Sequence, residues 1–442
     1  MQGQVKNGRA LPRWGIGLIA VIMVAVSANL NWGKKAYWEG LIKSDGKGYY
    51  AYLPAVFIYH DLNFAFFDSL DRGKYYSENG FYDYRIGYEG KVIDKYYCGT
   101  AVAQLPFFAA AHAVTKISGG EADGYSKWYQ VGINIAAVCW LLFGLFYLDN
   151  TLWLYGLKAA DRTAVLFAAV FGTHLFYYTL SEPALSHVYS FAFVCWFVYL
   201  AKAWFVSSGS RYLPCMALAL GMIVLIRPVN GLVVSALPFL AGGAPVLRGA
   251  VRNAFRHPLL LTASLLVFVA VTGIQLLEYK ISTGTFFVYS YGGETFHFAE
   301  PHMWDILFSY RKGLFLYTPL LFVSLAGLWF LREKPLFGIG AWLFFFVPVT
   351  YVLSSWWMWY YGGSFSSRVY VEYIPMFMLL LGICLRELAG AAKRGFMALL
   401  FLLVALCQVQ TYQYRYYQIH WSDMDREKYW EVFLRPDRIG AE

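Results

Sequence analysis

The sequence predicts an all-α polytopic membrane protein with about 11 transmembrane helices and a large first extracytoplasmic loop. Of the 442 residues, 59% are hydrophobic and only 14% are charged, whereas about 25% of the residues in a typical soluble protein are charged. The charges that a soluble domain of this size needs around its core are missing, which excludes an ordinary cytosolic enzyme. Aromatic residues form 20% of the chain, and Tyr and Trp are enriched where helices meet the membrane surface.

The N-terminal region predicts a retained membrane helix. Residues 1–13 are polar and carry Lys6, Arg9 and Arg13, and an apolar run covers 14–30. This run is longer than the apolar region of a signal peptide and has no clear small-x-small cleavage site. We therefore interpret 1–13 as a cytoplasmic N-terminus and 14–30 as the first transmembrane helix.

Further apolar runs follow along the chain, and most of them have the length of a membrane helix. They lie at 128–153, 163–180, 184–204, 212–227, 229–241, 259–277, 314–331, 336–354, 371–388 and 396–412. The run 229–241 is short, and whether it spans is left open.

The run 98–117 is ambiguous by hydropathy, and the positive-inside rule decides it. If this run does not span, the basic loops between the other runs all face the cytoplasm, and if it spans they all face outward. The basic residues of these loops are Lys158, Arg162, Lys202, Arg211, Arg248, Arg252, Arg256, Arg332, Lys334, Lys393 and Arg394. We therefore expect 98–117 to be an interfacial or re-entrant helix. The net charge of +9 then reflects topology and membrane lipids rather than nucleic acid.

This topology divides the chain into one bundle and several outer segments. Residues 31–97 contain 12 of the 36 tyrosines, which favours an ordered structure with interfacial helices rather than a disordered loop. Loops longer than about 12–15 residues are usually functional or disordered. The predicted segments are a first outer loop at 31–127, a bundle at 128–412 with outer loops at 278–313 and 355–370, and an outer tail at 413–442.

Asp45, in KSDGKGYYAYLPAVF, is the first candidate for chemistry. It follows the first span in a Gly-rich turn, and a carboxylate at the membrane surface suits a general base that acts on a sugar hydroxyl. The alternative is a structural Asp-Gly turn.

Arg227, in LIRPVNG, lies where a predicted span ends at a proline. The topology places this end outside, where an unpaired cation is less expected, and Arg suits bidentate pairing with phosphate. The alternatives are a guanidinium that reaches the membrane surface and a structural pair with an acid such as Glu182.

Glu182 and His187, in LSEPALSHVYSF, lie near the outer surface at the predicted start of a helix, which Ser181 and Pro183 mark. They are candidates for binding substrate. Their spacing points them apart on one helix, so we favour a carboxylate on the helix dipole and a hydrogen-bonded histidine over a shared metal.

The outer loops offer further substrate-binding candidates. Arg311 and Lys312 precede a span and would hold a phosphate or anchor the interface. Arg368 is four residues before Glu372, the spacing of a simple helix pair. Tyr361 belongs to an aromatic group that would stack on a sugar, cover an isoprenoid chain or form an interfacial belt. The other members of this group are Trp356, Trp357, Trp359 and Tyr360.

The sequence contains no P-loop, dinucleotide-binding GxGxxG, HExxH or GxSxG motif. The cysteines form no CxxC pair, and we expect them to pack in the core rather than to form disulfides or a metal site. They are Cys98, Cys139, Cys195, Cys215, Cys384 and Cys407.

Several stretches together resemble bacterial GT-C-type membrane glycosyltransferases, the group of the lipid-A aminoarabinose, protein-mannosyl and lipopolysaccharide-core sugar transferases. These stretches occur in order over most of the chain. They are KSDGKGYYAYLPA, VIDKYYCGTAVAQLPFFAAAH, LSHVYSFAFV, IRPVNG, YRKGLFLYTPLL and WWMWYYGGSFSSRVYVEYIP. The resemblance implies a GT-C-like helix bundle in the bacterial inner membrane. It also implies transfer of a sugar from a polyprenyl-phosphate carrier to a lipid, glycan or protein acceptor at the outer face.

The resemblance also implies roles for particular residues. Asp45 matches the acidic general base of the family, while Arg227, Arg311 and Arg368 would hold the carrier phosphate. The YYCG sequence departs from the Tyr-Pro before Gly of related proteins. The second acid of many relatives matches Asp61 or Asp94 loosely. Some members use a divalent cation such as Mg or Mn and others use none, and no ligand set is recognisable here.

Two other classes of protein remain open from the sequence. A transporter or flippase for a lipid-linked saccharide would also need a groove and interfacial arginines, although no inverted repeat is visible. A non-catalytic scaffold subunit is the third class.

Overall fold

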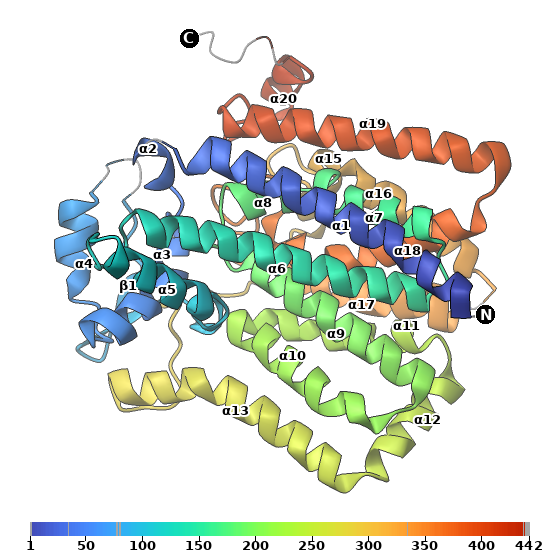
Figure 1. Ribbon diagram of the computed structural model, residues 1–442, viewed down its shortest axis with the longest axis horizontal. Coiled ribbons are helices and arrows are strands. Elements are labelled where there is room, and N and C mark those ends of the chain that lie inside the picture. Colours follow the sequence, from blue (N-terminus) through green and yellow to red (C-terminus); the bar gives the residue numbers. More distant parts are fainter. Residues whose placement is uncertain are drawn as a thin grey trace.

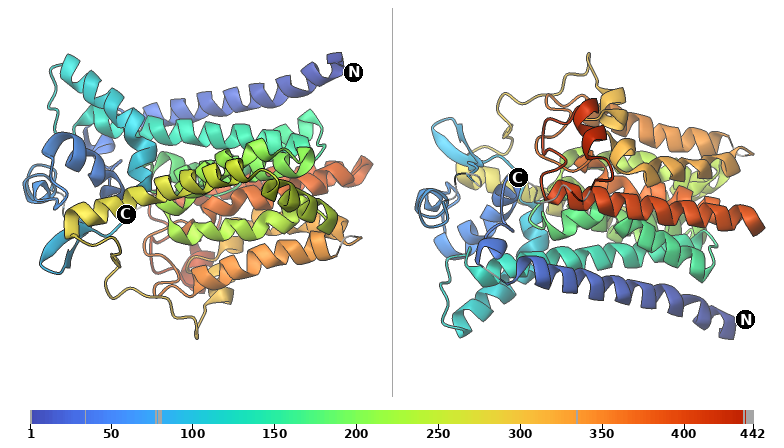
Figure 2. Two further views of the ribbon diagram at one scale, coloured as in Figure 1. Left: turned by 90° about the horizontal axis from the view of Figure 1, so that it is seen from below. Right: turned by 90° about the horizontal axis from the view of Figure 1, so that it is seen from above.

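A computed structural model describes residues 2–33, 35–76, 78, 81–333, 335–435 and 437. Long helices lie side by side along the longest axis of the molecule, and the segments between residues 35 and 126 form a cap at one end (Figures 1 and 2). Helix α1 (Gln2–Asn31) begins at the opposite end and runs toward the cap (Figure 1). These two ends are called the cap end and the far end below.

The cap combines short helical segments with one hairpin. Its elements are α2 (Lys35–Trp38), α3 (Asp45–Pro54), η1 (Ala55–Tyr59), α4 (Phe66–Ser69), η2 (Leu70–Lys74), β1 (Arg85–Tyr88), β2 (Lys91–Asp94) and α5 (Gly99–Ile117). Strands β1 and β2 pair antiparallel, and Glu89 and Gly90 between them have φ values of 45° and 77°. Positive φ at both central residues is typical of a tight hairpin turn. The prediction of an all-α chain is therefore wrong at this hairpin.

The bundle contains both long helices and short or broken ones. The elements of its first half are α6 (Lys127–Leu154), α7 (Ala159–Phe171), α8 (Leu175–Leu180), α9 (His187–Ser207), η4 (Ser210–Tyr212), α10 (Leu213–Ile226), η5 (Pro228–Ala236), α11 (Leu237–Ala241), α12 (Ala244–Phe255) and α13 (Pro258–Thr283). Those of the second half are α14 (Met303–Phe308), α15 (Leu314–Tyr317), α16 (Pro319–Ser324), η6 (Leu325–Leu331), η7 (Leu336–Gly340), α17 (Ala341–Ser354), η8 (Arg368–Tyr373), α18 (Ile374–Glu387), α19 (Gly390–Arg415) and α20 (Arg426–Val432).

Within the described residues, 7 helices are long and apolar enough to cross a membrane, or up to 8 if one bent pair counts as a span. The chain is therefore a multi-pass membrane protein. The 7 helices are Gly8–Asn31, Lys127–Leu154, His187–Ser207, Pro258–Thr283, Leu336–Ser354, Arg368–Glu387 and Gly390–Arg415, and the bent pair is Pro228–Ala241 with Ala244–Phe255.

The prediction of about 11 spans exceeds this number because apolar composition does not reveal where a helix breaks. The run 163–180 is divided between α7 and α8, while 212–227 and 314–331 correspond to shorter apolar helices. Helix α5, which covers the run 98–117, is not among the candidate spans of the described chain. Its position at the membrane surface remains a prediction.

Basic residues are concentrated at the far end, where the predicted cytoplasmic loops lie. Lys393 pairs with Asp161 at 2.6 Å, and Arg162 pairs with Asp149 at 3.1 Å. Lys202 donates to the carbonyl oxygen of Leu240 at 3.0 Å. These contacts join α19 to α7, α7 to α6 and α9 to α11, and α12 and the link between α18 and α19 lie at this end (Figure 1). Lys334 lies outside the described residues. Which end faces the cytoplasm remains a prediction.

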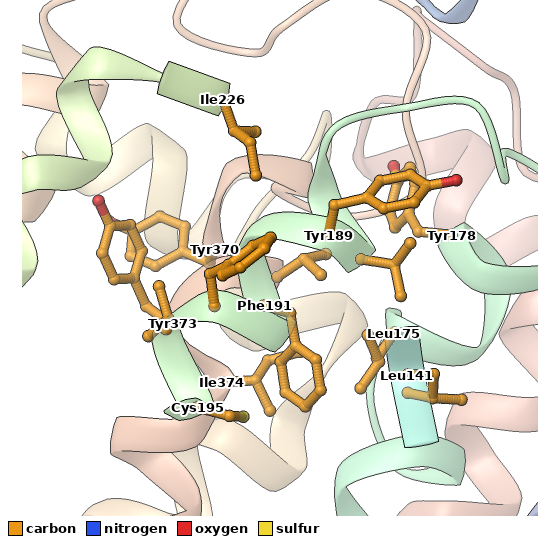
Figure 3. Packing of buried hydrophobic residues seen from close by; sticks show 14 of the residues in the cluster. Leu141, Leu175, Tyr178, Tyr189, Phe191, Cys195, Ile226, Tyr370, Tyr373 and Ile374 are labelled. Carbon is orange, nitrogen blue, oxygen red and sulfur yellow. The ribbon is translucent and has the colours of Figure 1, made fainter. Parts of the chain in front are cut away.

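The interior of the bundle is packed with large apolar side chains from helices far apart in the sequence. Leu141 of α6, Phe191 of α9 and Ile374 of α18 are fully buried in it (Figure 3). Within a membrane, close packing of this kind rather than exclusion of water holds helices together. It fixes the positions of α9 and η8, whose first residues are His187 and Arg368.

Candidate functional site

A cavity of about 2140 Å³ opens at the cap end. Helix α3 contributes Asp45, α9 contributes His187, the α10–η5 junction contributes Arg227 and η8 contributes Arg368 to its lining. Tyr361, of the predicted aromatic loop, lines it as well. The structure thus brings together candidates that are scattered over more than 300 residues of the sequence.

Asp45 forms an ion pair with Arg368, with 2.6 Å between Oδ2 and Nη2. Burial alone would raise the pKa of the Asp45 carboxyl, but the Arg368 guanidinium, a hydrogen bond from Tyr96 and the charge of Lys95 together lower it below its ordinary value. Asp45 is therefore ionised at neutral pH, and its side chain remains 21% exposed.

The glycines after Asp45 allow α3 to approach its neighbours closely. A Cβ on Gly46 would lie 2.8 Å from the Cβ of Ala184, and one on Gly48 would lie 2.4 Å from the ring of Tyr96. Larger residues at these positions would push α3 away from the bundle. The predicted Gly-rich turn is wrong, because DGKG forms the start of helix α3. Close packing around the carboxylate explains its glycines.

Glu372 is the centre of a second cluster. Its Oε1 accepts hydrogen bonds from Nδ1 of His187 at 3.0 Å, Nη1 of Arg227 at 3.3 Å and Nδ2 of Asn230 at 3.5 Å. Glu372 is fully buried and does not line the cavity in the part of the chain that the structure describes. It therefore acts on the cavity only through His187 and Arg227.

The expected helix pair between Arg368 and Glu372 is wrong. These residues lie in η8, a 3₁₀ segment from Arg368 to Tyr373, which has three residues per turn. Residues four apart therefore point about 120° away from each other. Arg368 faces Asp45, and Glu372 faces the interior.

The structural alternative for Arg227, a pair with a buried acid such as Glu182, is met by a different acid, because Arg227 pairs with the buried Glu372 at 3.3 Å. Glu182 pairs with Lys43 at 3.2 Å and accepts a hydrogen bond from the hydroxyl of Tyr177 at 3.3 Å. Helix α9 begins at His187, later than the predicted start, so Glu182 lies in the preceding turn. Glu182 and His187 both line the cavity, but they have different partners.

Arg311 and Lys312 do not line the cavity among the residues described. The guanidinium of Arg311 lies 3.4 Å from the ring centre of Tyr360, and its Nε donates to the carbonyl oxygen of Ser422 at 3.1 Å. Lys312 donates to the carbonyl oxygens of Ser364 and Trp421, and burial lowers its pKa to about 7. Both side chains fasten the C-terminal tail to the 355–370 loop.

Asp61 and Asp94, which match the second acid of the family loosely, also lie outside the cavity lining in the described chain. Asp61 caps a turn by accepting from the backbone N–H groups of Asn63 and Ala65. Asp94 is fully buried, and burial raises its pKa well above the ordinary value. Of Asp45, Asp61 and Asp94, Asp45 is the one that lines the cavity in the described chain.

The structure adds lining residues that the sequence analysis missed. Tyr49 lies one helical turn after Asp45 and lines the cavity, where the charges of Arg227, Asp45 and Arg368 act on its hydroxyl. Its spacing on α3 is a signal that sequence reasoning could have used. The pair of Lys95 with Glu294, at 2.6 Å, had no such signal because the two residues are far apart in the sequence.

Within the described residues, no group of three or more His, Cys, Asp or Glu side chains is placed to hold a metal ion. The described cysteines are free, and Cys98, Cys195, Cys384 and Cys407 are buried. Cys139 and Cys215 are exposed, so the expectation of core packing is wrong for these two. The cavity is lined by one histidine, several tyrosines and a set of charged groups: the carboxylates of Asp45, Glu182 and Glu294, the guanidinium groups of Arg227, Arg368 and Arg415, and the amines of Lys43 and Lys95.

No family model matches the sequence, and no curated protein matches it either. Among solved structures, the chain is similar to the crystal structure of ArnT from Cupriavidus metallidurans bound to undecaprenyl phosphate. The TM-score is 0.51 with 14% sequence identity, over 91% of this chain and 69% of that chain. At this identity the likeness shows the fold. The predicted helix bundle is therefore ArnT-like in its fold.

Proposed function

We propose that this multi-pass protein transfers a sugar from a polyprenyl-phosphate carrier to a lipid, glycan or protein acceptor. The observation that carries the proposal is the cavity itself. Within an ArnT-like fold, it is lined by an accessible carboxylate, Asp45, which pairs with Arg368, and by a second guanidinium, that of Arg227. We further propose that the reaction occurs at the extracytoplasmic face of the bacterial inner membrane, because the basic loops lie at the far end and the cavity at the cap end.

The cavity suits a substrate that is part lipid and part anion. Arginine guanidinium groups bind phosphate oxygens in pairs, most strongly where water is scarce. Apolar side chains continue the lining beside Arg227, which suits an isoprenoid chain that enters from the membrane. These side chains are Val229, Leu232, Val234, Phe296 and Val352.

In the proposed reaction, a hydroxyl of the acceptor attacks the anomeric carbon of the carried sugar. Its proton passes to the carboxylate of Asp45, the new C–O bond forms, and the bond between the sugar and the phosphate oxygen breaks. The polyprenyl phosphate leaves with the electron pair, and Arg227 and Arg368 stabilise its charge. A phosphate that shares Arg368 weakens the hold of this arginine on Asp45, which raises the basicity of the carboxylate when the donor is bound.

The function is tested with purified protein in proteoliposomes that contain undecaprenyl phosphoryl-glucose, -mannose or -arabinose and a lipid extract from bacterial envelopes as acceptor. Mass spectrometry follows the carrier. The proposal expects bare undecaprenyl phosphate and a glycosylated product to accumulate from at least one donor, and protein-free liposomes serve as the control. A flippase would instead move the intact donor between leaflets, so movement without loss of the sugar contradicts the proposal.

A further inference from the structure

His187 has a buried contact that determines which of its ring nitrogens carries the proton. Its Nδ1 lies 3.0 Å from Oε1 of Glu372, which also receives Arg227 and Asn230. An ionised carboxylate accepts hydrogen bonds only. Nδ1 must therefore be the N–H of the ring, and in a neutral imidazole Nε2 is then the acceptor.

The orientation of Asn230 supports an ionised Glu372. The hydroxyl of Tyr373 donates to Oδ1 of Asn230 at 3.1 Å, so the NH₂ group of this amide faces Ser190, at 2.8 Å, and Glu372. His187, Arg227 and Asn230 thus all donate to Oε1 of Glu372. A protonated carboxyl would not need them.

The ring edge with Nε2 faces the cavity. His187 lines the cavity, whereas Glu372, toward which Nδ1 points, is not part of the lining in the described chain. The rest of the ring is enclosed, since His187 is only 2% exposed and the Tyr178 ring packs against it with 5.2 Å between centroids. The cavity therefore contains one fixed nitrogen acceptor.

The surroundings favour a neutral ring. Nδ1 already donates to Glu372, so the neutral ring satisfies its buried contact without a second proton. The site is thus suited to accepting a hydrogen bond rather than to taking a proton.

We propose that Nε2 of His187 accepts a hydrogen bond from a hydroxyl group of the carried sugar, and that Glu372 is a positioning residue that fixes the ring tautomer. This inference rests on the proposed function. The phosphate that the arginines would hold has only acceptor oxygens, so it offers no donor to Nε2. The sugar is bonded directly to that phosphate, and hydroxyls are the donors it presents within reach.

The inference is tested by measuring two affinities for each variant in nanodiscs. One is for bare undecaprenyl phosphate, and the other is for the tightest-binding of the glucose, mannose and arabinose derivatives. Loss of one neutral hydrogen bond lowers affinity about 3- to 10-fold. We expect His187→Ala to lose this factor for the sugar-bearing carrier and to leave the affinity for the bare carrier unchanged. His187→Gln, whose amide oxygen can take the place of Nε2, should restore it.

His174→Gln is the matched control, because His174 is also a fully buried histidine but lies outside the described lining. Unchanged affinity for the bare carrier shows that each variant is folded. The inference is wrong, while the proposed function stands, in either of two cases. In the first, the wild type binds the bare carrier as tightly as every sugar-bearing carrier. In the second, His187→Ala keeps the higher affinity for the sugar-bearing carrier. If His187→Gln fails to restore binding, the acceptor role is excluded. Failure of the wild type to bind the bare carrier refutes the proposed function and the inference that rests on it.

Discussion

Two carboxylate–guanidinium pairs at the cavity contain the same chemical groups but differ in their access to solvent. Asp45 and Arg368 are 2.6 Å apart and both line the cavity, with 21% of the Asp45 side chain exposed. Glu372 and Arg227 are 3.3 Å apart, but the Glu372 side chain is completely buried. Glu372 also holds His187, whereas Asp45 is reached from the cavity.

Access decides what each acid can do. A general base must come within hydrogen-bond distance of the proton it removes, which Asp45 satisfies and Glu372 does not. A buried carboxylate instead organises the donors around it, and its loss leaves them without a partner. The comparison therefore supports the proposal that Asp45 is the base, and it gives Glu372 the arrangement of Arg227 and His187.

The largest expected effect comes from removing the buried acid. Glu372→Ala leaves Arg227 without its partner, and breaking a buried pair costs about 3–5 kcal/mol of stability. Asp45→Ala opens a pair that faces the cavity, where water can reach the remaining guanidinium, so it should cost less than Glu372→Ala. Unfolding by SDS in mixed micelles compares the two variants. Equal losses of stability would show that access does not separate the pairs.

The second prediction concerns the phosphate. Arg227→Ala should weaken binding of undecaprenyl phosphate by about 2–5 kcal/mol, as for a desolvated charge pair. Arg227→Lys should weaken it less, because Lys keeps the charge but loses the planar fork that fits two phosphate oxygens. Titration of the carrier in nanodiscs measures both. A folded Arg227→Ala variant with unchanged affinity rules out the phosphate role.

Much of the fold could be predicted from the sequence because long apolar runs and basic loops have direct physical meanings in a membrane. The runs located the helices, and the positive-inside rule grouped the basic loops at one end. The predicted number of spans was too high because composition does not show that the run 163–180 is broken into two helices, α7 and α8. The hairpin at 85–94 was missed because its strands are short.

The site was predictable residue by residue but not as a set of pairs. Asp45 was identified from a Gly-rich segment after the first span, Arg227 from the end of a span and Arg368 from an outer loop. Their partners were not, since Asp45 and Arg368 are 323 residues apart in the sequence. The i,i+4 rule failed for Glu372 because it assumes an α-helix where the chain forms a 3₁₀ segment.

The third prediction tests the accessible acid. Asp45→Asn keeps size and polarity but cannot accept a proton as a carboxylate does, so transfer should fall at least ~10²-fold, the lower range for loss of a general base. Carrier release in proteoliposomes measures this. Asp61→Asn is the matched control, since Asp61 caps an exposed turn. Normal transfer by Asp45→Asn together with inactivity of Asp61→Asn would identify the other carboxylate as the base.

The pH dependence follows from the same pair. Arg368 contributes to a lowered pKa of Asp45, so the base stays ionised as the pH falls until that low pKa is reached. Arg368→Gln removes the positive charge, and burial then raises the pKa. The acid side of the profile of kcat/KM should therefore move to higher pH in this variant. An unmoved profile would mean that another group limits the rate at low pH.

The smallest effect is expected at Arg311. This arginine does not line the cavity in the described chain, whereas Arg227 and Arg368 do. Arg311 stacks on Tyr360 and pairs with Asp423 at 3.4 Å on a partly exposed surface, and such pairs are worth about 0–1 kcal/mol. Arg311→Gln should therefore lower stability by no more than about 1 kcal/mol and leave the affinity for undecaprenyl phosphate within about twofold of the wild type. The family resemblance suggests instead that Arg311 holds the phosphate, which requires a loss comparable to that of Arg227→Ala. The same nanodisc titration distinguishes these outcomes, because a large loss would mean that the tail and the 355–370 loop move to bring Arg311 into the cavity when the carrier binds.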